Sequence, residues 1–445
     1  MSQPIIQLTT EELAQHLAEQ DATLIDVRPA DAYNGWPLKQ EQRGGHIAGA
    51  RNLPLKWAGY IDWLEIVRSK GIKEEDTLVL YGYSADDAEQ VARRFIRSGY
   101  HAVKVYNDFK DEWSADPLYP MGALKHYRNL VPAVWLKKLQ DNVSPGEYEQ
   151  NKYVVCHAHY RHREAYEEGH IPGAIALDTN TLESPETWNR RSAEELKAAL
   201  EGMGITHDTT VILYGRFAYP DNNDPFPGSS AGQLAAIRSA VIMMYAGVKD
   251  VRVLNGGLQS WVDEGCALSF EDAEYQPIDD FGCEIPARPK IMIDTLEARE
   301  YLQSVERELI SVRSWPEFCG ETSGYNYIEK KGRIPGAVFG NCGSDAYHME
   351  NYRNPDHTMR EYHEIEQFWR EAGITPEKAN AFYCGTGWRG SEAFFCAWLM
   401  GWPRVSVYDG GWFEWSNDPE NPVERGVPSE DETGRLADVL QGEGT

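Results

Sequence analysis

The chain has 445 residues, of which 42% are hydrophobic and 25% are charged. At about 100–200 residues per domain, this length predicts roughly three domains and excludes a single large core, while the apolar content excludes a disordered chain. The 43 Lys and Arg residues against 70 Asp and Glu residues give a net charge of −27. Such a charge excludes sequence-independent binding to nucleic acid or to anionic lipid, and an anionic substrate therefore needs a local positive site.

The N-terminal segment and the cysteines indicate the compartment. Residues 1–20 lack the basic and apolar regions of a secretion signal, and no stretch of the chain approaches the ~18 apolar residues of a membrane span. The seven cysteines are scattered and include no Cys-x-x-Cys pair, which argues against a disulfide framework and against a structural zinc site. We expect a cytoplasmic protein with free thiols, without a metal or another cofactor, and with neither nucleic acid nor a membrane as a partner.

The first third of the chain contains an apolar strand that ends in an aromatic residue. The run Thr-Leu-Val-Leu-Tyr at 77–81 precedes Gly82, and the next strand ends at Tyr106, 24 residues later. The block His-Ile-Ala-Gly-Ala lies upstream, at 46–50. A strand, a loop, a helix and a second strand form the predicted unit.

The middle third repeats this pattern. Thr-Val-Ile-Leu-Tyr at 210–214 precedes Gly215, and His-Ile-Pro-Gly-Ala at 170–174 is the upstream block. Residues 231–246 predict a helix after this corner. The Pro, Gly, Asn and Asp residues at 220–230 predict a surface loop that is inserted in this copy.

The third copy carries a cysteine at the corner. Asn-Ala-Phe-Tyr at 380–383 precedes Cys384, the next strand ends at Tyr408, again 24 residues later, and a helix is predicted over 390–400. Its upstream block is Arg-Ile-Pro-Gly-Ala at 333–337. Because strands alternate with helices in every copy, the sequence predicts the α/β class, with a mainly parallel sheet flanked by helices in each unit. The predicted domains are residues 1–124, 125–275 and 286–445.

Cys384 is the candidate nucleophile. It lies between a strand end and a helix N-terminus in the run Cys-Gly-Thr-Gly-Trp-Arg, whereas Gly82 and Gly215 at the corresponding corners carry no nucleophile. Backbone N–H groups of such a loop, together with the partial positive charge of the helix, favour an anion at the centre of the loop, and Gly385 and Gly387 permit its tight curvature. The alternative is a small buried hydrophobic cysteine; the loop around Cys384 favours the nucleophile.

A second group of residues raises the question of a metal. Cys156, His157, His159 and His162 lie close together in the sequence, but their spacings match no standard zinc pattern. We therefore interpret these histidines as surface residues rather than as ligands.

The three units resemble the rhodanese (thiosulfate sulfurtransferase) family over nearly the whole chain, and they are most similar to its three-domain bacterial members. The family motif is visible as Asp-Val-Arg at 26–28 and as Ser-Val-Arg at 311–313, whereas Cys-His-Ala at 156–158 takes its place in the second unit. The resemblance implies three tandem rhodanese-like domains, of which the first two are inactive, with Gly82 and Gly215 at the cysteine position, and the third is catalytic.

The resemblance also implies a reaction. Cys384 would take the outer sulfur of a small-molecule donor as a persulfide and pass it to a thiophilic acceptor, with a protein as an alternative acceptor. The loop from Cys384 to Arg389 has six members, which resembles sulfurtransferases, whereas the related phosphatases and arsenate reductases have one residue more. Arg389 would bind the anionic donor and stabilise the persulfide. Thiosulfate is the expected donor, which would make the chain a thiosulfate sulfurtransferase.

Two alternatives stay open beside thiosulfate. The run Cys-Gly-Thr-Gly is similar to 3-mercaptopyruvate sulfurtransferases, although Arg389 resembles bacterial thiosulfate enzymes. The second alternative is a protein-to-protein persulfide relay with little turnover of small donors. Arg313 either belongs to the site or forms a structural ion pair with Glu317, four residues later. The expected substrate-binding residues are Gly385, Thr386, Gly387, Trp388 and Arg313.

Overall fold

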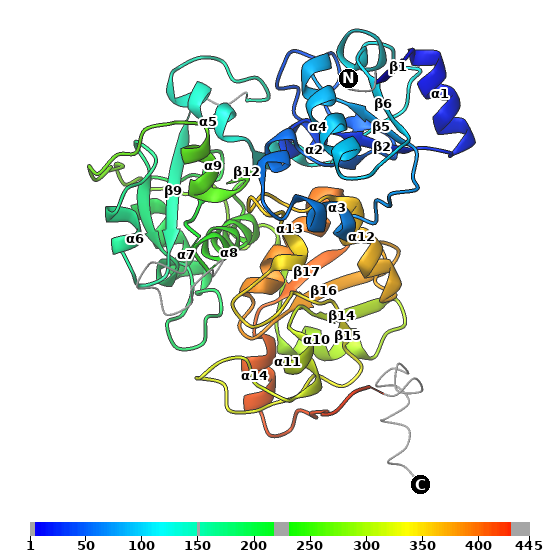
Figure 1. Ribbon diagram of the computed structural model, residues 1–445. Coiled ribbons are helices and arrows are strands. Elements are labelled where there is room, and N and C mark those ends of the chain that lie inside the picture. Colours follow the sequence, from blue (N-terminus) through cyan, green and yellow to red (C-terminus); the bar gives the residue numbers. More distant parts are fainter. Residues whose placement is uncertain (1–4, 149–151, 218–230, 429–445) are drawn as a thin grey trace. The chain divides into compact units, whose positions relative to one another are not determined.

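The computed structural model of the chain describes residues 5–148, 152–217 and 231–428 (Figure 1). Two compact units are present, one that ends at Arg128 and one that begins at Asn129. The surface loop predicted at 220–230 lies outside the described residues. No helix of the described ranges is both long enough and apolar enough to cross a membrane.

The first unit contains one five-stranded parallel sheet with the strand order β1-β6-β5-β2-β4 and a short antiparallel pair, β3 with β7. Its strands are β1 (Ile6–Leu8), β2 (Thr23–Asp26), β3 (His46–Ile47), β4 (Arg51–Asn52), β5 (Leu78–Tyr81), β6 (Val103–Tyr106) and β7 (Met121–Gly122). Its helices are α1 (Thr10–Glu19), α2 (Ala30–Asn34), α3 (Trp63–Ser69) and α4 (Ala85–Arg97), with the short helices η1 (Leu55–Gly59) and η2 (Phe109–Trp113).

The second unit contains two further five-stranded parallel sheets, and the first of them has the strand order β10-β9-β11-β12-β8. Its strands are β8 (Leu130–Val131), β9 (Tyr153–His159), β10 (Ile175–Asp178), β11 (Thr210–Tyr214) and β12 (Asp250–Leu254). The helices of this part are α5 (Ala133–Gln140), α6 (Glu164–Glu167), α7 (Ala193–Gly202), α8 (Ala231–Ala246) and α9 (Gly257–Asp263), with the short η4 (Thr179–Thr181). A further short helix, η3 (Tyr127–Asn129), precedes β8.

The last sheet has the strand order β13-β17-β16-β14-β15. Its strands are β13 (Met292–Ile293), β14 (Arg307–Ser311), β15 (Val338–Phe339), β16 (Ala379–Tyr383) and β17 (Val405–Tyr408). The helices are α10 (Thr295–Leu302), α11 (Trp315–Cys319), α12 (Tyr362–Glu371), α13 (Trp388–Met400) and α14 (Gly411–Asn417), with the short η5 (Pro289–Ile291) and η6 (Glu350–Tyr352).

The predicted fold class is confirmed, because the three sheets share one topology. In each sheet the strand that runs into the corner, β5, β11 or β16, is the central one. In the first two domains the tyrosine at the end of this strand fixes the upstream block: the hydroxyl of Tyr81 accepts a hydrogen bond from the backbone N–H of Ile47 (3.0 Å), and that of Tyr214 accepts one from Ile171 (2.8 Å). The hydroxyl of Tyr383 forms no hydrogen bond of this geometry among the described residues. These bonds explain why the His-Ile-x-Gly-Ala block and the aromatic strand end recur together.

The strand register corrects one detail of the motif comparison. Asp26 lies opposite Tyr81, His157 opposite Tyr214 and Ser311 opposite Tyr383. The counterpart of Asp-Val-Arg in the second domain is therefore the run 157–159, one residue later than the sequence comparison placed it. The second domain lacks the motif residues, so the sequence alone does not show how it aligns with the other two. The pairing of the strands identifies the equivalent position.

The interpretation of the histidines as surface residues is also wrong for two of them. His157 and His159 are buried, whereas His162 is exposed. Burial lowers the pKa of His157 to about 3, so this imidazole is neutral. Within the described ranges, no three His, Cys, Asp or Glu side chains are grouped so that they could hold a metal ion.

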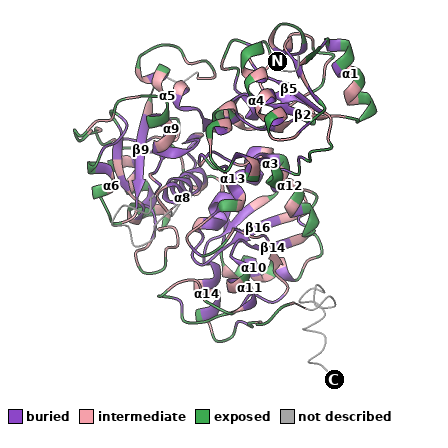
Figure 2. Cartoon of the chain, in the orientation of Figure 1, coloured by how far each residue is buried: buried purple, intermediate pink, exposed green. Residues whose placement is uncertain are grey.

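Two helices position the site, and the predicted bounds are right for one of them, whereas the predicted start is two residues late for the other. Helix α8 has the predicted bounds and is buried along nearly its whole length (Figure 2). Helix α13 begins at Trp388 rather than at residue 390, so the last two members of the six-residue loop already belong to its first turn. Gly387, with φ at 85°, is the N-cap of α13, and this left-handed conformation favours glycine.

Candidate active site

Cys384 lies directly after β16 and is fully buried. Its carbonyl oxygen accepts a hydrogen bond from the backbone N–H of Trp412 (2.8 Å), and that of Gly385 accepts one from Phe413 (2.9 Å), so both carbonyls point at the first turn of α14. Among the described residues, the backbone N–H groups of 385–389 donate no hydrogen bond. These unpaired donors at a helix N-terminus are suited to hold an anion beside Cys384.

Glycines allow other elements to pack closely on this loop. A Cβ atom on Gly385 would lie 2.3 Å from the ring of Tyr325, and a Cβ atom on Gly411 would lie 2.6 Å from the carbonyl oxygen of Gly385. Neither distance is tolerated by a real side chain. The loop is thus fixed between a tyrosine ring on one side and the start of α14 on the other.

Arg389 is committed to a buried ion pair. Its Nη1 donates to Oε2 of Glu317 (3.0 Å) and its Nη2 donates to Oε1 (2.8 Å), in the bidentate geometry typical of Arg and carboxylate. Nη2 also donates to the Tyr325 hydroxyl (2.8 Å), and Nη1 lies 3.0 Å from Sγ of Cys342. Only Nε has no partner in the described part of the chain. The side chain that was expected to bind the donor therefore uses both terminal nitrogens within the protein.

Glu317 connects the two arginines that the sequence singled out. Besides Arg389, it receives Nε of Arg313 (3.3 Å) and both the N–H and the hydroxyl of Ser314 (3.0 and 2.8 Å). Burial alone would raise the pKa of Glu317, but the two guanidinium groups and the Ser314 bonds lower it to about 2. The remaining bonds of Arg313 go to the carbonyls of Gly332 and Ser323. Arg313 therefore forms the ion pair with Glu317, which was one of the two interpretations of this residue.

Two tyrosines beside Cys384 were missed by the sequence analysis. The Tyr325 ring packs on Gly385, and the Tyr327 ring packs against Tyr325 at a tilt, with ring centres 5.0 Å apart. Burial, together with the nearby Cys384 sulfur, raises the pKa of both phenols, so both stay protonated. The two tyrosines lie in a loop of the sequence, where no helix or strand periodicity indicates which way a side chain points. Sequence reasoning therefore could not place them at the site.

The second domain contributes side chains to the same region. The ring of Trp188 stacks on Tyr327 (4.6 Å) and contacts Phe413 edge-on (5.5 Å), while the ring of Tyr160 contacts Trp388 edge-on (5.5 Å). The indole N–H of Trp188 donates to the Tyr160 hydroxyl (2.9 Å) and links the two pairs. We refer to the following residues as the aromatic cluster: Tyr160, Trp188, Tyr325, Tyr327, Trp388 and Phe413. Tyr327 is exposed and the other five are partly buried, whereas Cys384 beside them is fully buried.

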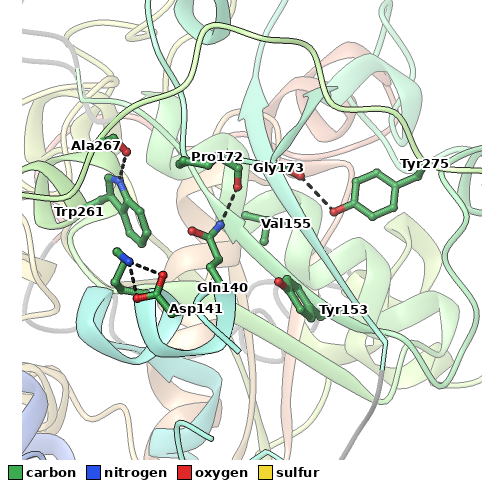
Figure 3. A pocket seen from close by; sticks show the side chains of 10 residues that line it. Gln140, Asp141, Tyr153, Val155, Pro172, Gly173, Trp261, Ala267 and Tyr275 are labelled. Atoms are coloured by element: carbon green, nitrogen blue, oxygen red, sulfur yellow. Dashed lines mark hydrogen bonds and ion pairs between the residues drawn. The ribbon is translucent and has the colours of Figure 1, made fainter. Parts of the chain in front are cut away.

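A cavity of about 690 Å³ lies elsewhere in the second domain (Figure 3). Tyr153 and Val155, from the first half of β9, line it together with Trp261 and Tyr275. Tyr153 pairs with Thr210 at the start of β11, at the opposite end of the strand from the Gly215 corner. This cavity is therefore separate from the corner and contains none of the predicted site residues.

Comparison with known proteins identifies the family. The rhodanese-like domain family matches three segments of the chain, residues 9–116, 135–264 and 294–418. Thiosulfate sulfurtransferase YnjE of Escherichia coli is 42% identical over 414 residues, which cover 92% of this chain and 90% of YnjE. Sulfur carrier protein TtuD of Thermus thermophilus is 33% identical over 272 residues, covering 59% of this chain and 87% of TtuD.

Solved structures of EanB are more similar still. Wild-type EanB is 60% identical, with a TM-score of 0.93 over 96% of this chain and 99% of EanB. A complex of EanB with ergothioneine covalently linked to a persulfide cysteine is 59% identical, again with a TM-score of 0.93 and covering 96% of this chain and 100% of EanB. The three matched domains, the shared sheet topology and these relatives lead to one conclusion: the chain is a member of the rhodanese family, a sulfurtransferase built from three rhodanese-like domains.

Proposed function

We propose that this sulfurtransferase carries a sulfane sulfur as a persulfide on Cys384 and transfers it to the imidazole C2 carbon of hercynine, the trimethylammonium betaine of histidine. The product is ergothioneine, the corresponding 2-thione. Complexes of EanB with hercynine and with ergothioneine, at 59% identity to this chain, support the choice of acceptor. The proposal keeps the predicted division into two inactive domains and one catalytic domain.

The observation that carries the proposal is a match in spacing around the cysteine. The EanB structures include variants of a tyrosine that lies 59 residues before the persulfide cysteine, of a threonine two residues after it and of a cysteine 42 residues before it. A second cysteine changed in the same variant lies 73 residues before it, where this chain has Ser311. Counted from Cys384, the first three spacings lead to Tyr325, Thr386 and Cys342. All three lie at the site: Tyr325 packs on the loop, Thr386 is part of it, and Cys342 contacts Arg389.

The aromatic cluster suits the charge of this acceptor. A quaternary ammonium group cannot donate a hydrogen bond and is recognised through the faces of aromatic rings. The partly exposed rings beside Cys384 offer such faces, and the buried carboxylates nearby are already engaged with arginines. The trimethylammonium group of the zwitterionic hercynine is thus suited to these rings, whereas the N–H groups of 385–389 are suited to the anionic donor.

In the first half-reaction the Cys384 thiolate attacks the outer sulfur of thiosulfate. A new S–S bond forms, the S–S bond to the sulfonate breaks, and sulfite leaves with the electron pair. The unpaired N–H groups of 385–389 would stabilise the negative charge on the persulfide. The Arg389 and Glu317 pair would hold the first turn of α13 in place, a role different from the direct donor contact that the sequence indicated.

In the second half-reaction the terminal persulfide sulfur bonds to C2 of the imidazole while the Tyr325 phenol donates its proton to the ring nitrogen. The Tyr325 phenolate then removes the C2 proton, the C=S bond forms, and the persulfide S–S bond breaks to return the Cys384 thiolate. The sulfane sulfur gains the two electrons that the carbon loses, so no external oxidant is required. Arg389 donates an N–H to the Tyr325 hydroxyl and opposes the rise in pKa that burial causes, which favours proton donation by the phenol.

A second candidate is transfer from thiosulfate to a simple thiophilic acceptor such as cyanide. Its support is YnjE, which is 42% identical over 92% of this chain and is a thiosulfate sulfurtransferase. The two candidates share Cys384 and the first half-reaction. They differ in whether the aromatic cluster recognises the acceptor.

The test is to supply the purified chain with hercynine and with thiosulfate or, in parallel, inorganic polysulfide, and to quantify ergothioneine by mass spectrometry. We expect many turnovers per chain with at least one donor, and a loss of more than a hundredfold in Cys384→Ser. Cys266→Ser, a change of a partly exposed cysteine outside the site, serves as the control and keeps full activity. Rapid thiocyanate formation from cyanide without ergothioneine would favour the second candidate, and ergothioneine formation by Cys384→Ser would reject both.

A further inference from the structure

Helix α8 of the second domain contains one buried arginine. Arg238 is the only charged residue among the sixteen of this helix, and it is fully buried. A buried arginine is costly unless it is paired, and a hydrophobic residue at such a position is often as stable or more so. The contacts of Arg238 therefore call for an explanation beyond packing.

Arg238 joins two buried carboxylates. Its Nε donates to Oε2 of Glu183 (3.1 Å), and its Nη2 donates to Oδ1 of Asp409 (2.5 Å) and to the carbonyl of Trp188 (2.8 Å). Asp409 receives a second arginine, Arg190, through its backbone N–H (3.0 Å) and its Nη1 (2.8 Å). Glu183 belongs to the second domain, whereas Asp409 belongs to the catalytic one.

Both carboxylates lead to the Cys384 loop. The indole N–H of Trp388 lies 3.1 Å from each oxygen of Glu183. Asp409 lies two residues before α14. In the first turn of this helix, the N–H groups of Trp412 and Phe413 hold the carbonyls of Cys384 and Gly385. Arg238 also reaches the loop itself, since Nη1 lies 3.0 Å from the position that a Cβ atom on Gly387 would occupy.

We propose that Arg238 is a positioning residue for Cys384, through which the second domain completes the active site of the third. It fixes the loop from two sides, at Trp388 through Glu183 and at the start of α14 through Asp409. This role gives a use to a domain that carries Gly215 where the nucleophile would be. The inference rests on Cys384 as the proposed nucleophile, but not on hercynine as the acceptor.

The experiment measures single-turnover loading of Cys384 with thiosulfate or inorganic polysulfide in the full chain. The main variant combines Arg238→Met with Glu183→Gln, so that no carboxylate is left unpaired, because Asp409 keeps Arg190. A displacement of about 1 Å in a reacting group can cost a hundredfold in rate. We expect the loading rate constant at saturating donor to fall at least tenfold, while the amplitude stays near one sulfur per chain and the half-saturating donor concentration changes less than threefold.

This readout separates positioning from folding. A purely structural role would lower the amplitude, which counts folded sites, and would leave the rate constant unchanged; that result overturns the inference. Arg238→Lys keeps the charge but cannot reach both carboxylates in one geometry, so we expect an intermediate rate. If the double variant does not fold, Arg238→Lys decides alone, and loading at the native rate overturns the inference.

The matched control is Arg252→Met. Arg252 is a buried arginine of the same domain, paired with Asp250 (2.9 Å) and stacked on Trp135, and it makes no contact with the loop. We expect it to load at the native rate, and equal slowing in both variants would overturn the inference. Cys384→Ser is included because loading that survives there would reject the nucleophile itself, an outcome distinct from failure of the role of Arg238.

Discussion

Glu317 holds two arginines in the interior of the third domain. All three side chains are almost fully buried, and Glu317 lies closer to Arg389 (2.8 Å) than to Arg313 (3.3 Å). A carboxylate in such a position stabilises the folded chain only while it is ionised, because only the charged form attracts the two guanidinium groups. Removal of one partner from a buried pair leaves an uncompensated charge and typically costs about 3–5 kcal/mol.

Glu317→Gln tests this pair through the pH dependence of stability. The folded-state pKa of Glu317 is lowered to about 2 from 4.5, so its contribution of about 3 kcal/mol is complete above pH 4.5 and is lost as the pH falls toward 2. We expect the variant to be less stable than the native chain at pH 7, with a difference that shrinks between pH 4.5 and pH 3. Urea unfolding followed by tryptophan fluorescence at several pH values measures it.

The control for this prediction is Glu194→Gln, in the first turn of α7, where the side chain is exposed. It should leave the acid limb of the stability curve unchanged. A stability difference between native chain and Glu317→Gln that is the same at pH 7 and pH 3 would show that the ionised pair is not the source of the effect.

At the scale of single residues, the sequence predicted what is local and missed what is distant. Cys384 could be selected because its strand, its glycines and its helix are contiguous in the chain. The partners of Arg389 could not, since Glu317 is 72 residues away and Tyr325 is 64 residues away. An arginine at the end of a loop looks alike in sequence whether it faces a substrate or a buried carboxylate.

The Cys384 loop is held in place by contacts with neighbouring elements. The carbonyls of the loop are held by the first turn of α14, and the ring of Tyr325 covers Gly385 from the other side. The absence of a side chain at Gly385 is what lets the phenol approach. A methyl group at this position must displace either the ring or the loop.

Gly385→Ala is therefore expected to lower ergothioneine formation at least tenfold, because the added Cβ would lie 2.3 Å from the Tyr325 ring. The measurement is turnover with hercynine, together with a melting curve to verify folding. Gly202→Ala, at the end of α7, is the matched control: its Cβ would meet no atom within 4 Å, and its turnover should equal that of the native chain. Full activity of Gly385→Ala would mean that the contact with Tyr325 is unimportant.

At the scale of elements, the repeat was the most reliable signal. The strands that end at Tyr81, Tyr214 and Tyr383 were found because the same pattern recurs three times, with the same spacing to the next strand in the first and third copies. Two errors occurred at this scale. The second domain has lost its motif, so the register was one residue off, and Trp388 and Arg389 at the start of α13 were assigned to the loop. In both places hydrogen bonding, rather than residue type, decides the structure.

At the scale of the whole molecule, the chain contains three copies of one fold. The number of units and their shared topology could be predicted from the sequence, but the contacts between the second domain and the Cys384 loop could not. Glu183, Trp188 and Arg238 reach the loop only through tertiary packing, since α8 packs against α13. Arg238 is the one charged residue of α8, which could have indicated a buried ion pair. The sequence could not have identified Asp409 as its partner.

The central claim, that Cys384 carries the sulfur which hercynine receives, is tested most directly by intact-mass spectrometry of the whole chain in a single turnover. After treatment with donor and removal of the excess, we predict a gain of about 32 Da, the mass of one persulfide sulfur, mapped by peptide analysis to Cys384. One equivalent of hercynine should then return the chain to its original mass and yield one equivalent of ergothioneine. An adduct located on another cysteine, or a loss of the adduct without ergothioneine, would contradict the account.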